Sequence, residues 1–549
     1  MSNNITKNQK SNILDILDNS KISRIIFLII LGISGIVFRL VFFPYDVPLF
    51  DDSQGYFWYA IDASLLNNIF PEGHNLTNNG WPIFVSIFFQ FIDSNNFLDY
   101  QNIQRLIGVV FSVATIFPVY LLCTKFVKKG YSLLGTTLFI CEPRLIQNSS
   151  LGTPESMYVF LIASILTLFL STDFKKIYLA FFIVGLLSLV RYEGILIIIP
   201  LSVIFFLRFR FKKKDLLKYF ICITVFCLVI IPVGYLKNET TGQDGFVSHI
   251  SAGPEFYQKS IEQNSSSSTE FLEKGITNMI KFLGWVQIPS FLIFVPLGII
   301  LFFKKMDYKK TLIILTSIMI LIPAFYAYSR DFSETKYLYA LFPIFSLIAC
   351  FTFKKIFDSY DKKKLIMCLI LIGIILSSSI FISWKMPDNE HYRETYQIIK
   401  QISDKQITIN SDFGTHGGEF LYFHWTRLNN VNDFPILKDD LPVSNISYNK
   451  QIVIENGMRI HNLQYDDKSN ITNLKDYLKL LEKQNVTHLF VDKINISRLI
   501  NNDLRNELQQ VFYNENNYPF LIKEYDSKEN GFKYHVKLFK IKYENIEGI

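Results

Sequence analysis

Long apolar runs alternate with short polar segments over the first two thirds of the chain, from about residue 22 to residue 384. A helix that crosses a bilayer needs roughly 20 predominantly apolar residues. The pattern therefore predicts a polytopic α-helical membrane protein. Its roughly 11 spans, some of them short, are predicted at residues 22–43, 103–124, 131–147, 156–171, 177–190, 194–207, 216–236, 282–303, 311–328, 338–353 and 365–384.

The pattern changes after residue 384, where polar and apolar positions are mixed. Short alternating runs predict strands at Gln406–Asn410 and His488–Val491, and a closing strand pair within Lys533–Ile541. The segment Leu474–Lys483 has the period of a helix. Residues 385–549 are thus predicted to form a separate α/β domain after the membrane domain of residues 22–384.

Charge predicts the orientation, because Lys and Arg gather on the cytoplasmic side of a membrane protein. The first predicted outer loop, residues 44–102, contains no Lys or Arg and seven Asp or Glu, whereas the predicted inner segments are rich in Lys. This places residues 1–21 in the cytoplasm and the C-terminal domain outside the cell membrane. The first span is too long for a removed signal peptide and reads as an anchor.

Composition excludes several classes of protein. The chain of 549 residues is 50% hydrophobic and 19% charged, with 52 Phe, which fits neither a disordered chain nor a coiled coil. Its net charge of +7 arises before residue 385, and the rest of the chain carries 21 Lys or Arg against 23 Asp or Glu. We therefore expect no nucleic-acid partner. The six cysteines show neither metal spacing nor a disulfide framework.

The first outer loop holds the most informative chemistry. Asp51 and Asp52 lie just beyond the first span and are followed by Tyr56-Phe57-Trp58-Tyr59. A carboxylate at the membrane boundary can accept a proton from a hydroxyl or bind a cation. Aromatic rings beside it, such as Tyr56 and Trp58, can support a sugar. The alternative is that the acids are solvated and the rings anchor the helix.

A second feature is a set of basic residues at the predicted outer ends of the spans, where the positive-inside tendency disfavours them. A guanidinium can bind a phosphate through two hydrogen bonds, and a lipid-linked donor would supply that phosphate. The alternative is that these side chains snorkel or pair with nearby acids such as Glu142, Glu155 and Glu193. The set comprises Arg39, Arg105, Arg144, Arg191, Arg330 and Lys336.

These motifs, in this order, resemble the C-type membrane glycosyltransferases. The resemblance is strongest to the branch of protein O-mannosyltransferases and aminoarabinose transferases and to archaeal relatives, and it covers about residues 20–384. After the acidic loop it rests on Asn79-Gly80-Trp81-Pro82, Glu142-Pro143-Arg144, Thr153-Pro154-Glu155-Ser156, Arg191-Tyr192-Glu193-Gly194, Arg330-Asp331 and Lys336-Tyr337-Leu338.

The resemblance implies transfer of a sugar from a polyprenyl- or dolichyl-phosphate donor to a protein, lipid or glycan acceptor on the outer face. It assigns the catalytic carboxylate to Asp52, with Asp51 as the fallback. It implies donor-phosphate contacts from Arg191 and Lys336, then from Arg144, Arg330 and Tyr337, and substrate contacts from Tyr56, Trp58, Trp81 and Glu155. The family often carries a tight Arg-Asp-x-Arg-Tyr arrangement, whereas here four residues separate Arg330-Asp331 from Lys336-Tyr337.

Other assignments remain open or weaker. The sequence identifies no cofactor, and His74 and His249 together with Asp51 leave a divalent metal open. The oligosaccharyltransferase branch is a weaker match, because a Trp-Trp-Asp signature is absent from the sequence. His416-Gly417-Gly418-Glu419 is predicted to be a turn. The competing function is a transporter or flippase for a lipid-linked or anionic solute, which would favour charges near the bilayer midplane and paired repeats.

Overall fold

The computed structural model describes residues 13–50, 52–65, 69–71, 76, 78–209, 212–242, 244–246, 268–402, 407–410, 459–461, 473–493 and 502–546. The chain divides into two compact units. The first, here called the helical unit, comprises Met1–Phe43, His74–Val85 and Gln104–Trp384. The second, here called the mixed unit, comprises Pro44–Gly73, Ser86–Ile103 and Lys385–Ile549. The predicted domain limits of 1–21, 22–384 and 385–549 stay a prediction.

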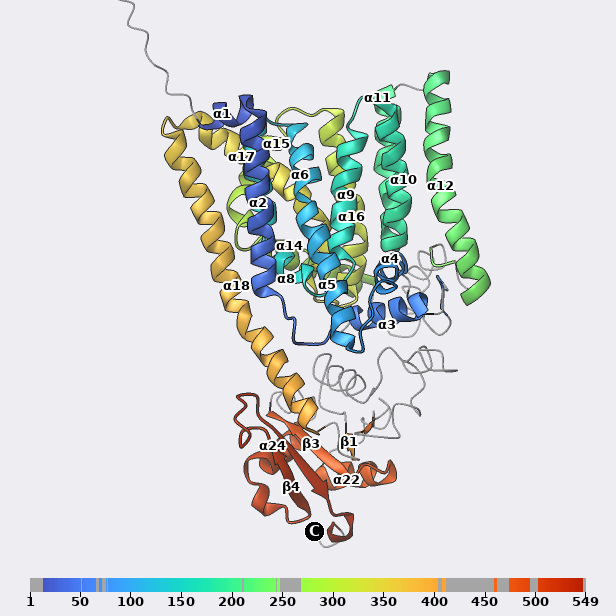
Figure 1. Cartoon of the computed structure of the whole chain (residues 1–549), viewed down its shortest axis with the longest axis vertical. Coiled ribbons are helices and arrows are strands. Elements are labelled where there is room, and N and C mark those ends of the chain that lie inside the picture. The colour runs from blue at the N-terminus through green and yellow to red at the C-terminus, as the bar shows by residue number, and fades with distance from the viewer. Residues whose placement is uncertain are drawn as a thin grey trace, which may run out of the picture. The chain divides into compact units, whose positions relative to one another are not determined.

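Apolar sequence in the first two thirds of the chain forms helices, because only a helix satisfies its own backbone polar groups in an apolar surrounding. Helices α9 and α10 pack along each other, and α12 packs on α10 (Figure 1). The helices up to α12 are α1 Ile13–Asn19, α2 Lys21–Phe42, α3 Asp52–Leu65, α4 Gly80–Phe89, α5 Phe97–Ala114, α6 Ile116–Thr124, α7 Lys129–Ile140, α8 Pro143–Ser149, α9 Glu155–Phe169, α10 Phe174–Val190, η1 Tyr192–Ile197, α11 Ile198–Phe209 and α12 Lys213–Thr241.

The second group of helices ends with the longest helix of the described chain, α18, which contributes residues to both units. Helix α17 belongs to the most enclosed of the membrane-length segments, Thr335–Ser359, and packs against α15, α7 and α6. This group comprises α14 Ser268–Val286, α15 Phe291–Phe302, α16 Tyr308–Ser329, η2 Thr335–Leu341, α17 Phe342–Ser359 and α18 Lys363–Ile402.

Seven helical segments of the described chain are long and apolar enough to cross a membrane, or eight if a bent pair counts as one span. The bent pair is Thr269–Val286 with Phe291–Phe302, at an angle of 111°. These eight segments coincide with eight of the predicted spans, and the other three fall on the shorter helices α7 with α8, α9, and α10. The chain is therefore a multi-pass membrane protein.

Arg39 shows how a charge is accommodated inside the helical unit. Its guanidinium is buried, and it donates to Ser112 Oγ at 2.8 and 3.1 Å and to the carbonyl oxygens of Gly35 and Ile140 at 3.0 and 3.3 Å. These bonds join α2 to α5 and α7. A buried charge needs such a set of partners, so Arg39 stabilises helix packing in this structure.

The mixed unit contains a five-stranded sheet in the order β2-β1-β3-β5-β4. Strand β1 runs parallel to β2 and β3, while β5 runs antiparallel to β3 and β4. Figure 1 shows the helices α22 and α24 beside the sheet. Apolar side chains of these helices form one hydrophobic core with the sheet. The elements are β1 Thr408–Asn410, β2 Arg459–His461, α22 Leu474–Lys483, β3 His488–Asp492, α24 Asn502–Tyr513, β4 Leu521–Asp526 and β5 Val536–Ile541.

Most of the predicted elements in this unit are confirmed. The predicted helix has the bounds of α22, and β1 and β3 lie within one or two residues of the predicted strands. The closing strand pair predicted within Lys533–Ile541 is wrong, because that segment holds only β5. Its partner β4 lies upstream, beyond a turn that contains Gly531 with a φ of 86°.

Candidate functional site

Asp52 is the first residue of α3, and its side chain is exposed. A carboxylate in the first turn of a helix is favoured by the helix dipole. Because the Asp52 side chain is exposed, a hydroxyl group can reach it from solvent. Asp51, the fallback for the same role, lies outside the described residues.

The segment before Asp52 is held by contacts within the mixed unit. The Leu49 amide donates to Gln101 Oε1 at 2.8 Å. Arg393 Nε lies 2.8 and 2.9 Å from the two carboxylate oxygens of Asp46, and the Phe50 ring stacks on Tyr392 at 4.7 Å. Residues of α18 thus anchor the irregular segment that leads into α3.

Tyr56 and Trp58 follow on α3, where their side chains are only 8% and 9% exposed. The neighbouring Phe57 ring lies 5.3 Å from Trp58 and 5.9 Å from Phe89, which makes this part of α3 an aromatic core. Burial of both rings limits the ring face that a sugar could reach. Their predicted contact with substrate stays a prediction.

Arg191 is the centre of a buried ionic cluster in the helical unit. It ends α10, and its guanidinium lies 2.8 Å from Glu155 Oε1 and 3.1 Å from Glu193 Oε1. The guanidinium also faces the rings of Tyr158 and Tyr337, at 5.6 and 5.9 Å from their centroids. Two carboxylates beside one guanidinium leave this cluster with one negative charge in excess.

Lys336 and Tyr337 bring a second cation and a hydroxyl to the same place. Both line a cavity of about 20 Å³ together with Arg191, Tyr158 and Glu193. A volume of this size holds about one water molecule. A larger group such as a phosphate would therefore contact this cluster at its opening, where Lys336 is only half-buried.

The other two predicted phosphate contacts lie elsewhere. Arg144 donates to the Trp285 carbonyl oxygen at 2.8 Å and faces the Phe381 ring at 5.2 Å. Arg330 lies over Tyr326 and Phe332, at 5.6 and 5.3 Å from the ring centroids. Neither lines the cavity beside Arg191. The structure thus brings together Arg191, Lys336, Tyr337 and Glu155 out of the predicted set.

Asn78 and the Gly80 of the adjoining Asn-Gly-Trp-Pro motif brace the turn that carries Arg191. The Tyr192 amide donates to Asn78 Oδ1 at 3.2 Å. Gly80 lies so close to this turn that a Cβ on it would be 2.6 Å from the Leu189 carbonyl carbon. Only glycine fits such a close approach of two backbones.

Trp81 fixes the neighbouring turn that leads to Glu155. Its ring is fully buried, and Nε1 donates to the Gly152 carbonyl oxygen at 2.9 Å, which also accepts from Gln104 Nε2 at 2.7 Å. Gly152 has a φ of 76°, a conformation that favours glycine. Trp81, predicted to contact substrate, therefore has a positioning role in this structure.

Replacing Trp81 with phenylalanine is expected to destabilise the protein by roughly 1–3 kcal/mol, because a buried hydrogen bond and part of a packed ring are lost. Thermal unfolding in lipid nanodiscs measures the change. Trp384→Phe is the control, since Trp384 is 65% exposed on α18. An unchanged melting temperature for Trp81→Phe would contradict the bracing role.

Sequence reasoning missed Tyr158 as a neighbour of Arg191. It lies one turn after Glu155 on α9, and residues three apart on a helix share a face. That spacing could have identified it, although a tyrosine within an apolar helix usually belongs to the core.

No group of three or more His, Cys, Asp or Glu side chains suited to a metal occurs among the described residues, which do not include His74, His249 or His416–Glu419.

No family model matches the chain, and no curated protein matches it either. Solved structures do. The oligosaccharyltransferase of Archaeoglobus fulgidus in its apo form is 13% identical, with a TM-score of 0.53 over 86% of this chain and 70% of that one. The oligosaccharyltransferase AglB of the same organism, in complex with an inhibitory peptide and a dolichol-phosphate, matches at 13% identity and a TM-score of 0.51 over the same shares.

ArnT from Cupriavidus metallidurans, bound to undecaprenyl phosphate, matches over nearly its whole length. The identity is 9% and the TM-score 0.54, and the match covers 96% of this chain and 99% of that chain. Likeness at such identities establishes the fold. The chain therefore has the fold of the C-type membrane glycosyltransferases, the family that its ordered motifs resemble.

Proposed function

We propose that the chain is a membrane glycosyltransferase that transfers a sugar from a polyprenyl- or dolichyl-phosphate donor to an acceptor on the outer face of the membrane. The observation that carries the proposal is the end-to-end likeness to ArnT, a protein bound to undecaprenyl phosphate in its own structure. The cavity lined by Arg191 and the half-buried Lys336 supports it, because both cations lie at the wall of one cavity.

In this mechanism Asp52 is the general base. An acceptor hydroxyl gives its proton to the Asp52 carboxylate while the hydroxyl oxygen forms a bond to the anomeric carbon. The bond from that carbon to the donor phosphate oxygen breaks, and the lipid phosphate leaves with the electron pair. A single displacement of this kind inverts the anomeric centre. Arg191 and Lys336 stabilise the charge on the leaving phosphate.

The proposed topology has 11 spans, a cytoplasmic N-terminus and an outer C-terminal segment. It is supported by the first outer loop, which has seven acids and no Lys or Arg. Helices α7 with α8, α9, and α10 supply the three spans that are shorter than the others. This topology puts Asp52 and the C-terminal segment on the side where a lipid-linked donor presents its sugar after translocation.

Of the two cations, Lys336 is the one that the geometry leaves most available to a phosphate. Arg191 is shared by two buried carboxylates. Lys336 Nζ pairs at 2.6 Å with Glu334, whose side chain is 52% exposed. Pairs at the surface contribute about 0–1 kcal/mol, so an incoming phosphate can take the place of Glu334 at little cost.

Lys336→Gln is expected to raise the KM for the lipid-phosphate donor about tenfold or more without lowering thermal stability. The lost contact is a charge-assisted hydrogen bond, which contributes about 1.5–3 kcal/mol. Donor titrations with purified protein measure the effect. The matched control is Lys385→Gln, which removes another surface pair, with Asp388 at 3.1 Å. An unchanged KM in Lys336→Gln would remove this residue from the donor site.

The proposed function is tested by offering the purified protein a panel of polyprenyl-phosphate and polyprenyl-pyrophosphate sugars. We expect consumption of a monophosphate donor and release of the lipid phosphate. Consumption of pyrophosphate donors alone would assign the chain to oligosaccharyltransferase chemistry. Movement of a lipid-linked sugar across a vesicle membrane without consumption of any donor would support the transporter instead.

A further inference from the structure

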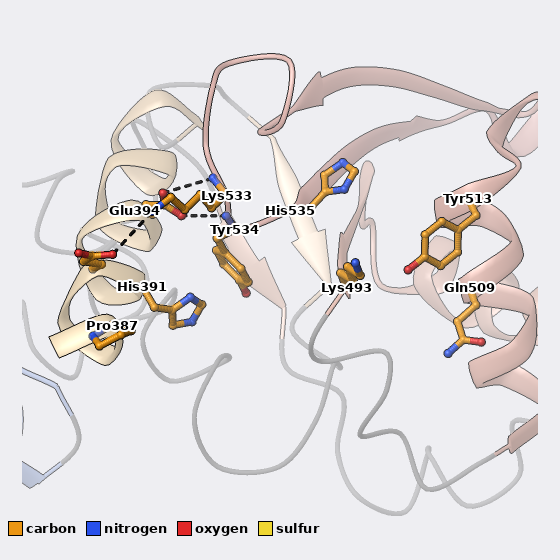
Figure 2. Close-up of a pocket in the computed structure, with 10 residues that line it drawn as sticks. Pro387, His391, Glu394, Lys493, Gln509, Tyr513, Lys533, Tyr534 and His535 are labelled. Atoms are coloured by element: carbon orange, nitrogen blue, oxygen red, sulfur yellow. Dashed lines mark hydrogen bonds and ion pairs between the residues drawn. The ribbon is translucent and has the colours of Figure 1, made fainter. Parts of the chain in front are cut away.

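A cavity of about 850 Å³ lies within the mixed unit, apart from the residues assigned to the donor. Figure 2 shows His391 on the part of α18 that belongs to this unit and Gln509 and Tyr513 on α24, with Tyr534 and Lys493 between them. Small-molecule sites commonly measure about 300–1,000 Å³, so this cavity has room for more than one sugar ring.

One wall of the cavity is held in place by several contacts. The carboxylate of Glu394 accepts from the backbone amides of Lys533 and Tyr534 at 3.2 and 2.8 Å (Figure 2). The Tyr534 hydroxyl donates to the buried carboxylate of Asp492, and the His391 ring meets the Tyr534 ring edge to face at 4.3 Å. A wall fixed in this way is pre-organised for a ligand, which lowers the entropy cost of binding.

The other wall presents an aromatic ring and an amide that the fold does not need. Gln509 and Tyr513 lie one turn apart on α24, and Tyr513 is 61% exposed. The core side chains of this helix are Leu504, Leu508, Val511 and Phe512. An exposed tyrosine beside an amide offers an apolar face together with donors and acceptors, the combination found in sites that recognise polar ligands with apolar faces.

Charge in the cavity is balanced. Lys493 and Lys533 contribute cations, and Glu390 and Glu394 contribute carboxylates. Burial lowers the pKa of His535 below its usual value, which favours the neutral ring. A strongly anionic or cationic ligand gains little from such a surrounding, whereas neutral hydroxyl groups can both donate to and accept from these side chains.

We propose that this cavity binds a short neutral oligosaccharide, and that this glycan is the acceptor. The assignment of this glycan as the acceptor rests on the proposed function, whereas the binding of a glycan in the cavity does not depend on it. Helix α18 contributes residues both to this cavity and to the contacts that hold the segment before Asp52, all of them within the mixed unit. His391 faces the cavity, while the adjacent Tyr392 and Arg393 hold the Asp46–Phe50 segment that leads into Asp52. A glycan in the cavity is thus held by the helix that anchors the proposed catalytic segment.

The test is binding of the full-length chain in lipid nanodiscs to an array of neutral oligosaccharides of one to six units. Maltoside detergents are removed beforehand, because their headgroup would compete. We expect binding to oligosaccharides of two or more units. The double variant Gln509→Ala/Tyr513→Ala is expected to weaken it at least tenfold. The matched control is Gln510→Ala/Asn514→Ala, which alters Gln510 of α24 and Asn514 directly after its end, both outside the cavity lining.

Three results would overturn the proposal. One is no binding to any neutral oligosaccharide by a chain whose thermal unfolding is normal. Another is equal binding by the two double variants. A third is binding only to acidic glycans or to a peptide library on the same surface. Asp52→Asn is expected to bind the array like the unaltered chain, so loss of transfer and loss of glycan binding can be told apart.

Discussion

Asp52→Asn is expected to lower sugar transfer by about 10²–10⁴-fold, the usual contribution of a positioned general base. Asparagine has nearly the same shape but cannot accept the acceptor proton. The side chain is exposed at the start of α3, where a carboxylate interacts favourably with the helix dipole by about 0.3–1 kcal/mol. The variant should therefore insert, fold and bind donor while transfer fails, which a single-turnover assay with a labelled donor measures.

Two comparisons sharpen this experiment. Asp93→Asn changes another exposed acid of the first outer loop and is expected to leave transfer unchanged. Asp51→Asn alters the neighbouring candidate and is expected to retain most activity. If transfer is lost in Asp51→Asn and kept in Asp52→Asn, the base is Asp51. If it is kept in both, the first outer loop does not supply the base.

The membrane part of the fold could be predicted from the sequence because hydropathy and backbone hydrogen bonding leave helices as the only choice for long apolar runs. What could not be predicted is how an apolar helix uses its rare polar residues. Arg39 was grouped with cations at the membrane boundary, yet the structure buries it on Ser112 and two carbonyl oxygens. Two of these partners, Ser112 and Ile140, lie 73 and 101 positions away in sequence, so only the packed fold identifies them.

The candidate site shows the same division. The resemblance implied phosphate contacts from five residues, with Arg191 and Lys336 ahead of Arg144, Arg330 and Tyr337, and the structure places Arg191, Lys336 and Tyr337 at one cavity. Arg144 and Arg330 share the boundary position of Arg191 in the sequence, but in the structure they face other rings and carbonyls. Helix α3 could not be predicted either, because the acidic and aromatic residues of this loop show no helical period.

Arg191→Met is expected to destabilise the protein on the order of 3–5 kcal/mol, the usual cost of breaking a buried ion pair by removing one partner. The side chains of Arg191 and Glu155 are only 11% and 6% exposed, so neither Glu155 nor Glu193 can recover its solvation. The melting temperature in nanodiscs measures this loss. Lys218→Met is the control, because it removes a more exposed pair, with Asp215 at 3.1 Å.

A triple variant, Arg191→Met/Glu155→Gln/Glu193→Gln, separates packing from phosphate binding. Neutral groups of similar size in place of a buried ionic cluster are often as stable as the cluster itself. We therefore expect the triple variant to regain most of the lost melting temperature while donor binding and transfer stay low. The guanidinium that we propose for binding the leaving phosphate is still missing in it. Full recovery of transfer together with stability would show that Arg191 serves only to neutralise its two carboxylates, and the phosphate role would then fall to Lys336 alone.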